Sequence, residues 1–331
     1  MVIVFAVFLL TLLVITAVAI VRTESLFVAV MLTGIFSLLM SANFFILDAA
    51  DVALTEAAVG AGVSTVLFLG ALALSAERER AVRMGRLLPV LVVSFMTLML
   101  IYATFDKPRL GDPEAPVHQH VAPWYLEKTP VLVGIPYVGP AVLGSVRGYV
   151  TLGELMVILT ACIGVLFLLS SPRGDDKKQL LPSLPARKAN YGLSHHLIPR
   201  VVGRLLIPFI VLFGLYVQFH GEYGPGGGFQ AGAIVATGII LYSIVEGEGK
   251  ALAAIPQWVL LPMVAGGALL YGGVGLAGLA LGGNFLDYSV LADDPVAGQH
   301  LGILLFEAGV GMTVCGGLLS IYHAFASRKG T

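Results

Sequence analysis

Four polar clusters stand inside or beside long apolar runs, where an ionised side chain is costly. Glu56, Glu154 and Glu307 lie deepest in these runs. Because hydrocarbon offers no water, a carboxylate at that depth needs a partner, a water molecule or a proton. Such groups can bind and release protons or cations. The residue types therefore indicate ion transfer across a membrane.

The first cluster lies in the stretch FILDAADVALTEAAVGAG. Asp51, Thr55 and Glu56 are four and five residues apart, so they share one side of the opening turns of an expected helix. Two interpretations of the aspartates stay open: Asp48 or Asp51 caps the helix by accepting free N–H groups, or joins an ion path. Glu56 lies a turn deeper, and we expect a functional role for it.

The second cluster lies in RGYVTLGELMVILTA. Arg147 stands at the edge of the apolar run, where an arginine is expected to extend its charge to the membrane surface. Glu154 lies about two turns further in, and Thr151 stands between them. We expect Thr151 and Glu154 to belong to an ion or proton path.

The third polar site consists of one carboxylate, Glu307, in the middle of the apolar run GILLFEAGVGMTVCGGLL. Gly309 and Gly311 follow it and allow another helix to approach closely. The same run contains no lysine that could neutralise the charge. We therefore expect Glu307 to be protonated or paired with another segment.

The fourth cluster is the stretch HGEYGPGGGFQAG at residues 220–232. A phosphate-binding loop is excluded, because an apolar run precedes the glycines and no P-loop lysine follows them. Two interpretations remain. One is a tight hairpin in which glycine permits unusual backbone angles, and the other is a broken-helix element whose free backbone groups line an aqueous path. The residues concerned are His220, Gly221, Glu222, Pro225, Gly226, Gly227, Gly228 and Phe229.

Covalent catalysis, cofactors and metal binding have no support in the sequence. It contains no nucleophile elbow, no HExxH and no CxxCH motif, so we do not expect an enzyme. Cys162 and Cys315 both lie in apolar runs and are expected to be buried thiols. The paired histidines have no matched ligands nearby and are expected to be solvated: His118 with His120, and His195 with His196.

The composition explains which elements must position these groups. Of the 331 residues, 57% are hydrophobic and 12% are charged, and the mean hydropathy is +0.92. A soluble domain carries about 25% charged residues, so the chain is expected to be an all-α integral membrane protein. Its net charge of -1 offers no basic surface for nucleic acid. The apolar N-terminal stretch lacks a basic region and a cleavage site, so we expect it to be a retained span.

A spanning helix needs about 20 apolar residues, and by that length the chain contains about nine spans. A polar linker at residues 171–200 is expected to separate a block of five spans, residues 1–170, from a block of four, residues 201–331. The two blocks predict two bundles, with a long external loop at 105–148. The expected spans are 2–21, 25–47, 52–75, 87–104, 149–170, 201–219, 229–245, 257–281 and 299–325.

Lysine and arginine mark one side of the membrane, because basic loops stay in the cytoplasm. They gather at residues 78–86 and 173–200, at Lys250, and at residues 328–329, whereas the loop 282–298 contains none. This pattern predicts an N-terminus outside and a cytoplasmic C-terminus. We expect a multi-pass protein of the inner (plasma) membrane.

The stretch YVQFHGEYGPGGGFQAGAIVATGIILY, followed by FEAGVGMTV, resembles the B subunit of the multisubunit Mrp-type Na+/H+ antiporters. In that family a helix ends in histidine–glycine and runs through PGGGF, and a glutamate–small–Gly–Val motif marks the last helix. Residues 200–325 match this pattern over most of their length. The resemblance favours a functional role for the glycine stretch over a plain hairpin.

DVALTEAAVGAGVSTVLFL and RGYVTLGE resemble the C-terminal part of the Mrp A subunit, together with its small-subunit counterparts in membrane-bound hydrogenases. The chain is therefore similar to a fusion of an A-type tail with a B subunit. Five residues in three places depart from the pattern. Val150 replaces a common aspartate, Glu56 and Gly60 stand where the A subunit has glutamine and glutamate, and Glu222-Tyr223 replaces another polar pair.

The resemblance implies a subunit of a cation/proton antiporter complex that transports Na+ and H+. The implied partners are large antiporter-like A- and D-type subunits, small subunits and the lipid bilayer. No lysine lies inside an expected span, so the chain lacks the Lys/Glu relay of those large subunits and is expected to form one part of the path. Two alternatives stay open: the ion-pumping arm of a redox enzyme such as a membrane-bound hydrogenase, and a purely structural scaffold.

Overall fold

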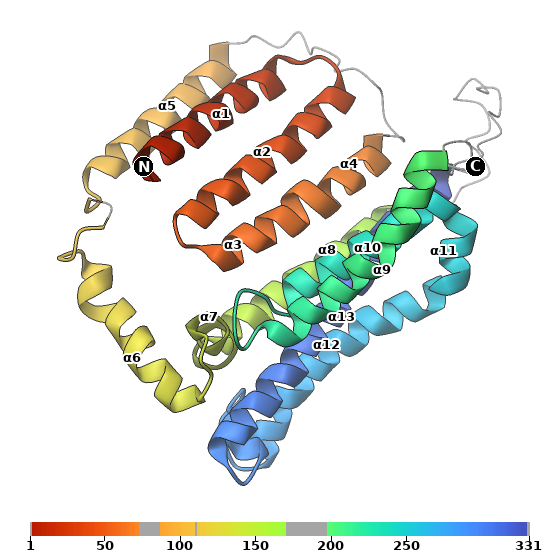
Figure 1. Ribbon diagram of the computed structural model, residues 1–331. Helices are drawn as coiled ribbons and strands as arrows, with labels where there is room; N and C mark the ends of the chain where they lie inside the picture. The colour runs from red at the N-terminus through yellow and green to blue at the C-terminus, as the bar shows by residue number, and fades with distance from the viewer. Residues whose placement is uncertain (1, 73–86, 110, 170–196, 330–331) are drawn as a thin grey trace.

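The computed structural model describes residues 2–72, 87–109, 111–169 and 197–329, in which the regular elements are helical (Figure 1). Within these ranges nine helices are long and apolar enough to cross a membrane, or ten if one bent pair counts as a span. The predicted all-α, multi-span architecture is confirmed. The nine candidate spans are Ile3–Arg22, Leu26–Ile46, Ala50–Leu72, Leu87–Phe105, Gly148–Leu169, Leu197–His220, Gly228–Glu246, Gln257–Ala280 and Pro295–Ala326.

Some predictions concern residues outside the described ranges. These are the paired His195 and His196, most of the linker 171–200 and the basic cluster at residues 78–86. The orientation of the chain and its division at the linker stay predictions of the sequence.

The bundle consists of α8 (Gly148–Leu169), α9 (Leu197–His220), α10 (Gly228–Glu246), α12 (Gln257–Ala280) and α13 (Pro295–Lys329). Most of the α13 span is buried, because α8, α10 and α12 all pack against it. The short helix α11 (Glu248–Ala254) joins α10 to α12. This packing joins helices from both sides of the predicted linker. The helix α8 precedes the linker and contacts α12 and α13, which follow it.

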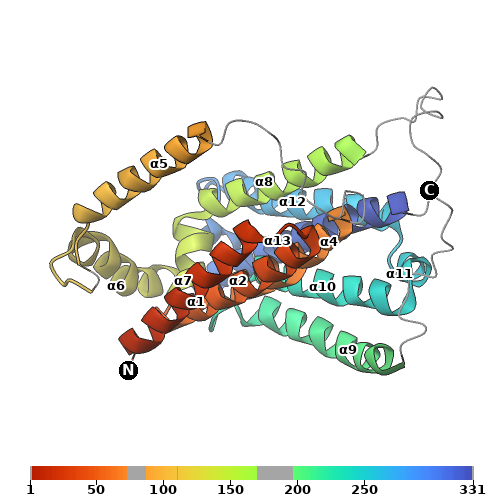
Figure 2. The same ribbon diagram turned by 90° about the horizontal axis from the view of Figure 1, so that it is seen from above.

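The N-terminal helices lie along one flank of the bundle (Figures 1 and 2). After α1 (Val2–Arg22) and α2 (Leu26–Ile46), the third span consists of three segments. It begins as α3 (Ala50–Thr55), widens into the π-helix η1 (Glu56–Ser64) and ends as α4 (Thr65–Leu72). The η1 segment packs between α2 and α10, so it joins the flank to the bundle. By contrast, α5 (Leu87–Phe105) stands apart from the bundle in both views.

Residues 105–148 were expected to form a long loop, but most of them are helical. They form η2 (Val117–Val121), α6 (Ala122–Val133), α7 (Val138–Pro140) and η3 (Ala141–Val146). The two halves of this segment are bent by 86°, at a break that Gly134 begins with a φ of 77°. The break matters for the site, because it carries Tyr137 to the glycine stretch.

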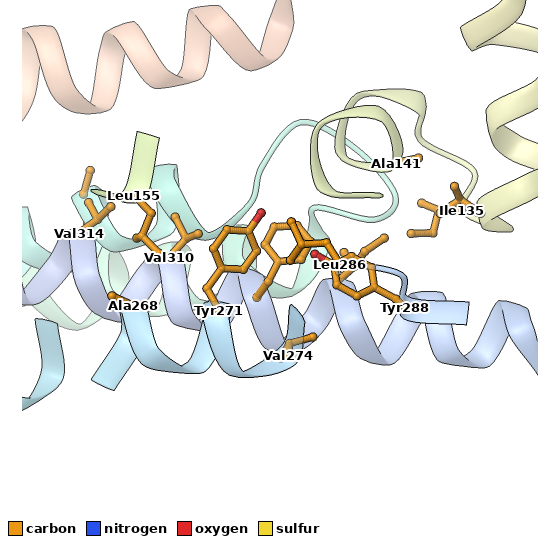
Figure 3. Close-up of a cluster of buried hydrophobic side chains, with 14 of the residues drawn as sticks. Ile135, Ala141, Leu155, Ala268, Tyr271, Val274, Leu286, Tyr288, Val310 and Val314 are labelled. Carbon is orange, nitrogen blue, oxygen red and sulfur yellow. The ribbon is translucent and has the colours of Figure 1, made fainter. Parts of the chain in front are cut away.

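A cluster of buried side chains joins α8, α12 and α13 (Figure 3). At its centre the Tyr271 hydroxyl donates a 2.8 Å hydrogen bond to the Gly148 carbonyl, which satisfies a buried polar group. The ring of Phe306 packs against Tyr271 and Tyr288, at centroid distances of 5.1 and 5.9 Å. Tyr288 lies in η6 (Tyr288–Leu291), the turn that precedes α13. The cluster therefore fixes the position of α13 relative to α8.

Small residues let α12 and α13 approach until their backbones touch. A Cβ atom at Gly267 would collide with the Gly309 carbonyl and would lie 2.9 Å from the Thr313 nitrogen. The neighbouring Gly266 faces open space, and a Cβ atom added there would meet no atom within 4 Å. Cys162 and Cys315 are buried free thiols in the same bundle, as predicted.

We expect Gly267→Ala to destabilise the folded protein by about 1–3 kcal/mol, because the added methyl group forces α12 away from α13. Gly266→Ala provides a matched control on the next residue, where a methyl group meets no neighbour. Thermal unfolding of the purified protein in detergent measures both effects. Equal midpoints for the two variants would contradict the close backbone contact.

Candidate functional site

A cavity of about 560 Å³ opens between the third span, the α7–η3 segment, α8, α10 and α13. Its lining brings together residues from both predicted blocks. Five predicted ion-path residues line it, together with four predicted residues at the junction between the glycine stretch and α10: Asp51, Thr55, Thr151, Glu154, Glu307, Gly226, Gly227, Gly228 and Phe229.

Glu307 is the most deeply placed carboxylate of this cavity, with only 6% of the residue exposed. The glycine stretch covers its carboxyl group. Cβ atoms added at Gly221 and Gly227 would lie 3.1 and 3.3 Å from its two oxygens, and one at Gly228 would collide with its backbone carbonyl. Side chains at these positions would therefore displace the stretch from α13. Glycine at these positions lets the backbone approach a buried carboxylate closely.

Gly227 is the N-cap of α10 and has φ 132° and ψ 177°, a combination that is essentially restricted to glycine. The chain turns there directly into the helix, so the first N–H groups of α10 end beside Glu307. The partial positive charge of a helix N-terminus stabilises a nearby anion. Burial disfavours the negative charge of Glu307. The described lining contains no lysine or arginine that could neutralise this charge.

Asp51 holds the glycine stretch from the opposite side of the cavity. One carboxyl oxygen accepts a hydrogen bond from the Tyr137 hydroxyl at 2.6 Å, and the other accepts the Gly226 N–H at 3.1 Å. The backbone N–H of Tyr137 also donates to the Glu222 carbonyl, at 3.3 Å. Asp51 thus bridges three segments, and helix capping is not its role. The N-cap of α3 is Ala49, which makes no side-chain capping bond.

A second link joins the third span to α10 through two uncharged side chains. Gln230, in the first turn of α10, donates a 2.9 Å hydrogen bond to the Thr55 hydroxyl oxygen. That hydroxyl in turn donates to the Asp51 carbonyl, at 2.8 Å. The π-helix η1 begins at the next residue, and π-helical turns occur often at functional sites.

The wall formed by α8 contributes Thr151 and Glu154. The Thr151 hydroxyl donates to the Leu143 carbonyl at 2.9 Å, which ties the start of α8 to η3. Glu154 is exposed in the isolated chain, unlike Glu307, and lies at the open side of the cavity. Arg147 is also exposed, in agreement with a position at the end of the span.

Three of the eight predicted ion-path residues lie outside the cavity lining. The carboxyl group of Glu56 lies beside Gly60 and Ser37, so it faces α2 rather than the cavity. His220 stacks on Tyr216 with ring centroids 4.8 Å apart. Glu222 pairs with His300, whose Nδ1 lies 2.9 Å from its carboxyl oxygen. The pair links the glycine stretch to the start of α13.

Sequence reasoning missed Tyr137, Gln230 and His300. Gln230 stands within the quoted glycine stretch, so a search for polar residues in the first turn of α10 would have found it. Tyr137 and His300 carry no such signal, because their roles depend on the bend after α6 and on the start of α13. The described residues contain no cluster of three His, Cys, Asp or Glu side chains that could hold a metal ion.

Two family models match the chain. One, described as a domain related to the MnhB subunit of the Na+/H+ antiporter, matches residues 198–320. The other, MbhD, described as the D subunit of MBH, matches residues 11–77. Both matches fall on helices that contribute to the cavity.

The chain is similar to a Rhizobium meliloti protein named as a probable A/B subunit of a K+/H+ antiporter. The two are 25% identical over 91% of this chain and 32% of that protein. A Staphylococcus aureus protein named as the putative antiporter subunit mnhB2 is 30% identical over 39% of this chain and 94% of its own length. The chain thus spans about a third of the longer relative and nearly all of the shorter one.

Two solved structures share the fold. A chain of the Mrp complex from Dietzia sp. DQ12-45-1b has a TM-score of 0.75 and 27% identity, over 96% of this chain and 34% of that one. A chain of the membrane-bound sulfane sulfur reductase, an archaeal respiratory membrane complex, has a TM-score of 0.52 and 28% identity. That match covers 71% of this chain and 95% of the other.

The candidate spans and the relatives together define a multi-pass membrane protein of the class of antiporter subunits. The chain belongs to the MnhB family of antiporter subunits, through its residues 198–320, and carries an MbhD region before them.

We expect Asp51→Asn to loosen the glycine stretch, because an amide has one acceptor oxygen for the two donors that Asp51 now binds. Hydrogen exchange at residues 221–227 should accelerate about tenfold, as the loss of a charged hydrogen bond implies. Peptide-resolved mass spectrometry measures this exchange. Asp48→Asn makes the same chemical change at an exposed residue and should leave it unaltered; equal exchange in both variants would rule out the bridge.

Proposed function

We propose that the chain is a subunit of a multisubunit cation/proton antiporter and that its 560 Å³ cavity is part of the ion or proton path. The observation that carries the proposal is the convergence of Asp51, Glu154 and Glu307 on one cavity within apolar helices. A purely structural role does not require three carboxylates in a common space. In hydrocarbon, ionisable side chains of this kind mark ion pathways and proton relays.

In this proposal Glu307 binds and releases the transported proton or cation at the buried end of the cavity. The first N–H groups of α10 stabilise its negative form, and the glycine stretch keeps bulk water away from it. Glu154 receives the ion at the open side. Asp51 holds the stretch in place through Gly226 and Tyr137.

The rest of the path belongs to other subunits in this proposal. No lysine lies in the nine candidate spans of the described residues, so the cavity offers carboxylates without the cationic partner of a Lys/Glu relay. The Mrp complex fold and the A/B-type relative support large A- and D-type subunits and small subunits as partners. We assign Na+ and H+ as the transported ions and the plasma membrane as the location.

We expect Glu307→Gln to slow cation/proton exchange by about tenfold or more, because an amide neither binds a proton reversibly nor carries charge. Glu154→Gln should slow exchange in the same direction. The measurement is the exchange rate in everted vesicles, divided by the amount of complex assembled on a native gel.

Glu24→Gln removes an exposed carboxylate between α1 and α2 and serves as the control. Wild-type exchange in assembled Glu307→Gln complexes would overturn the proposed path. Loss of assembly with unchanged exchange per complex would instead identify a scaffold.

We further propose that the N-terminus lies outside and the C-terminus in the cytoplasm, as the distribution of basic residues indicates. In whole cells, Asp293→Cys should react with a membrane-impermeant maleimide. Gly249→Cys, where an added Cβ meets no neighbour, should react only after the membrane is opened. The reverse pattern would contradict this orientation. The native thiols Cys162 and Cys315 are buried and give little background.

A second candidate function is the ion-translocating arm of a redox complex. It is favoured by the MbhD match and by the fold shared with the sulfane sulfur reductase chain. Neighbouring genes and co-purifying chains distinguish the two functions. Subunits with metal clusters would favour the redox complex, whereas only antiporter-like subunits would favour exchange.

A further inference from the structure

A second cavity, of about 550 Å³, lies further along the α8–α13 interface, beside the end of α8, the start of α12 and the end of α13. Most of its lining is apolar. The polar exceptions are Gln257 on α12 and Ser320 and His323 on α13. The proposed path through the first cavity does not use any of these three residues.

His323 is the unusual member of this lining. Only 2% of the residue is exposed, and neither ring nitrogen has a hydrogen-bond partner among the described residues. The nearby Ser320 hydroxyl cannot donate to the ring, because its proton is used in a 2.7 Å hydrogen bond to the Gly316 carbonyl. A buried polar group without a partner is costly, so a core histidine is normally satisfied. The ring of His323 therefore requires water or a proton donor within the cavity.

The described surroundings of His323 contain few ionisable groups. The parts of α8 and α12 that line the cavity contribute none. On α13 the ring of Tyr322 meets His323 edge to face, with centroids 5.6 Å apart, and its hydroxyl donates to Ser243 on α10. Glu248, at the start of α11, acts on Tyr322 electrostatically. No carboxylate among the described lining residues holds the imidazole permanently charged, which leaves it able to bind and release a proton.

A layer of packed side chains separates the two cavities. Glu307 and His323 are 16 residues apart on α13, a rise of about 24 Å along a helix. Between them, Leu155 of α8 packs with Val310 and Val314 in the buried cluster. Further along, the Cys162 thiol lies 3.8 Å from the Gly317 carbonyl. The interface therefore holds two cavities with a packed layer between them.

We propose that His323 is a proton-binding group that exchanges protons with water in the second cavity, at the end of α13 remote from Glu307. The unprotonated ring nitrogen takes a proton from a hydronium ion in the cavity, which leaves water, and the imidazolium returns the proton to water. The inference rests on the proposed function, and it adds a second protonatable group on the other side of the packed layer. The charge distribution of the chain assigns this end to the cytoplasm.

Chemical labelling of the intact complex tests access and titration without any substitution. Diethylpyrocarbonate modifies the unprotonated imidazole, and peptide mass spectrometry resolves each histidine. We expect the modification rate of His323 to rise with pH through a single midpoint. The exposed His118 and His120 provide solvent references in the same sample. If His323 stays unmodified at every pH after both references have reacted, the proposal is overturned.

His323→Gln tests the consequence for transport, because glutamine is polar but does not titrate. We expect exchange per assembled complex to fall about tenfold. His118→Gln makes the same substitution at an exposed site and should exchange at the wild-type rate. Wild-type exchange in His323→Gln combined with slow exchange in Glu307→Gln would overturn this inference alone. Wild-type exchange in both variants would overturn the proposed function as well.

Discussion

The backbone contact between the first turns of α10 and the middle of α13 determines where the polar groups of the cavity lie. A methyl group at Gly228 would collide with the Glu307 carbonyl, and one at Gly232 would lie 2.6 Å from the Gly311 carbonyl. Only at this separation can the glycine stretch cover the Glu307 carboxyl group while Gly226 still reaches Asp51. Helices in a bilayer associate through such packing, because lipid offers no hydrophobic driving force between them.

The spans were predictable, because length and hydropathy alone identify a helix that must satisfy its own backbone in lipid. The cost of a buried charge singled out Asp51, Glu154 and Glu307 individually, although nothing in the sequence placed them in one cavity. That convergence depends on packing between residues more than 100 positions apart. Glu56 shows the converse, since its spacing from Asp51 indicated a shared side whereas its carboxyl group lies against α2.

Three of the residues that sequence reasoning missed, Tyr137, His300 and His323, depend on three-dimensional packing. Tyr137 acts through the 86° break after α6, in a segment that its charges and prolines made look like a loop. His300 and His323 occur singly, and a lone histidine in an apolar run carries no spacing signal. His323 is buried, and neither of its ring nitrogens has a hydrogen-bond partner among the described residues. A missing hydrogen bond of this kind is visible only in the three-dimensional structure.

The π-helix η1 changes how this chain is to be compared with its relatives. An α-helix closes its hydrogen bonds over four residues, whereas a π-helix closes them over five, so its turn is wider. An alignment that matches residues one by one across Glu56–Ser64 therefore matches the directions of their side chains only where the relative also forms a π-helix. Glu56 and Gly60 stand where the related A subunit has glutamine and glutamate. Whether those residues are equivalent depends on helical pitch as well as on position in the sequence.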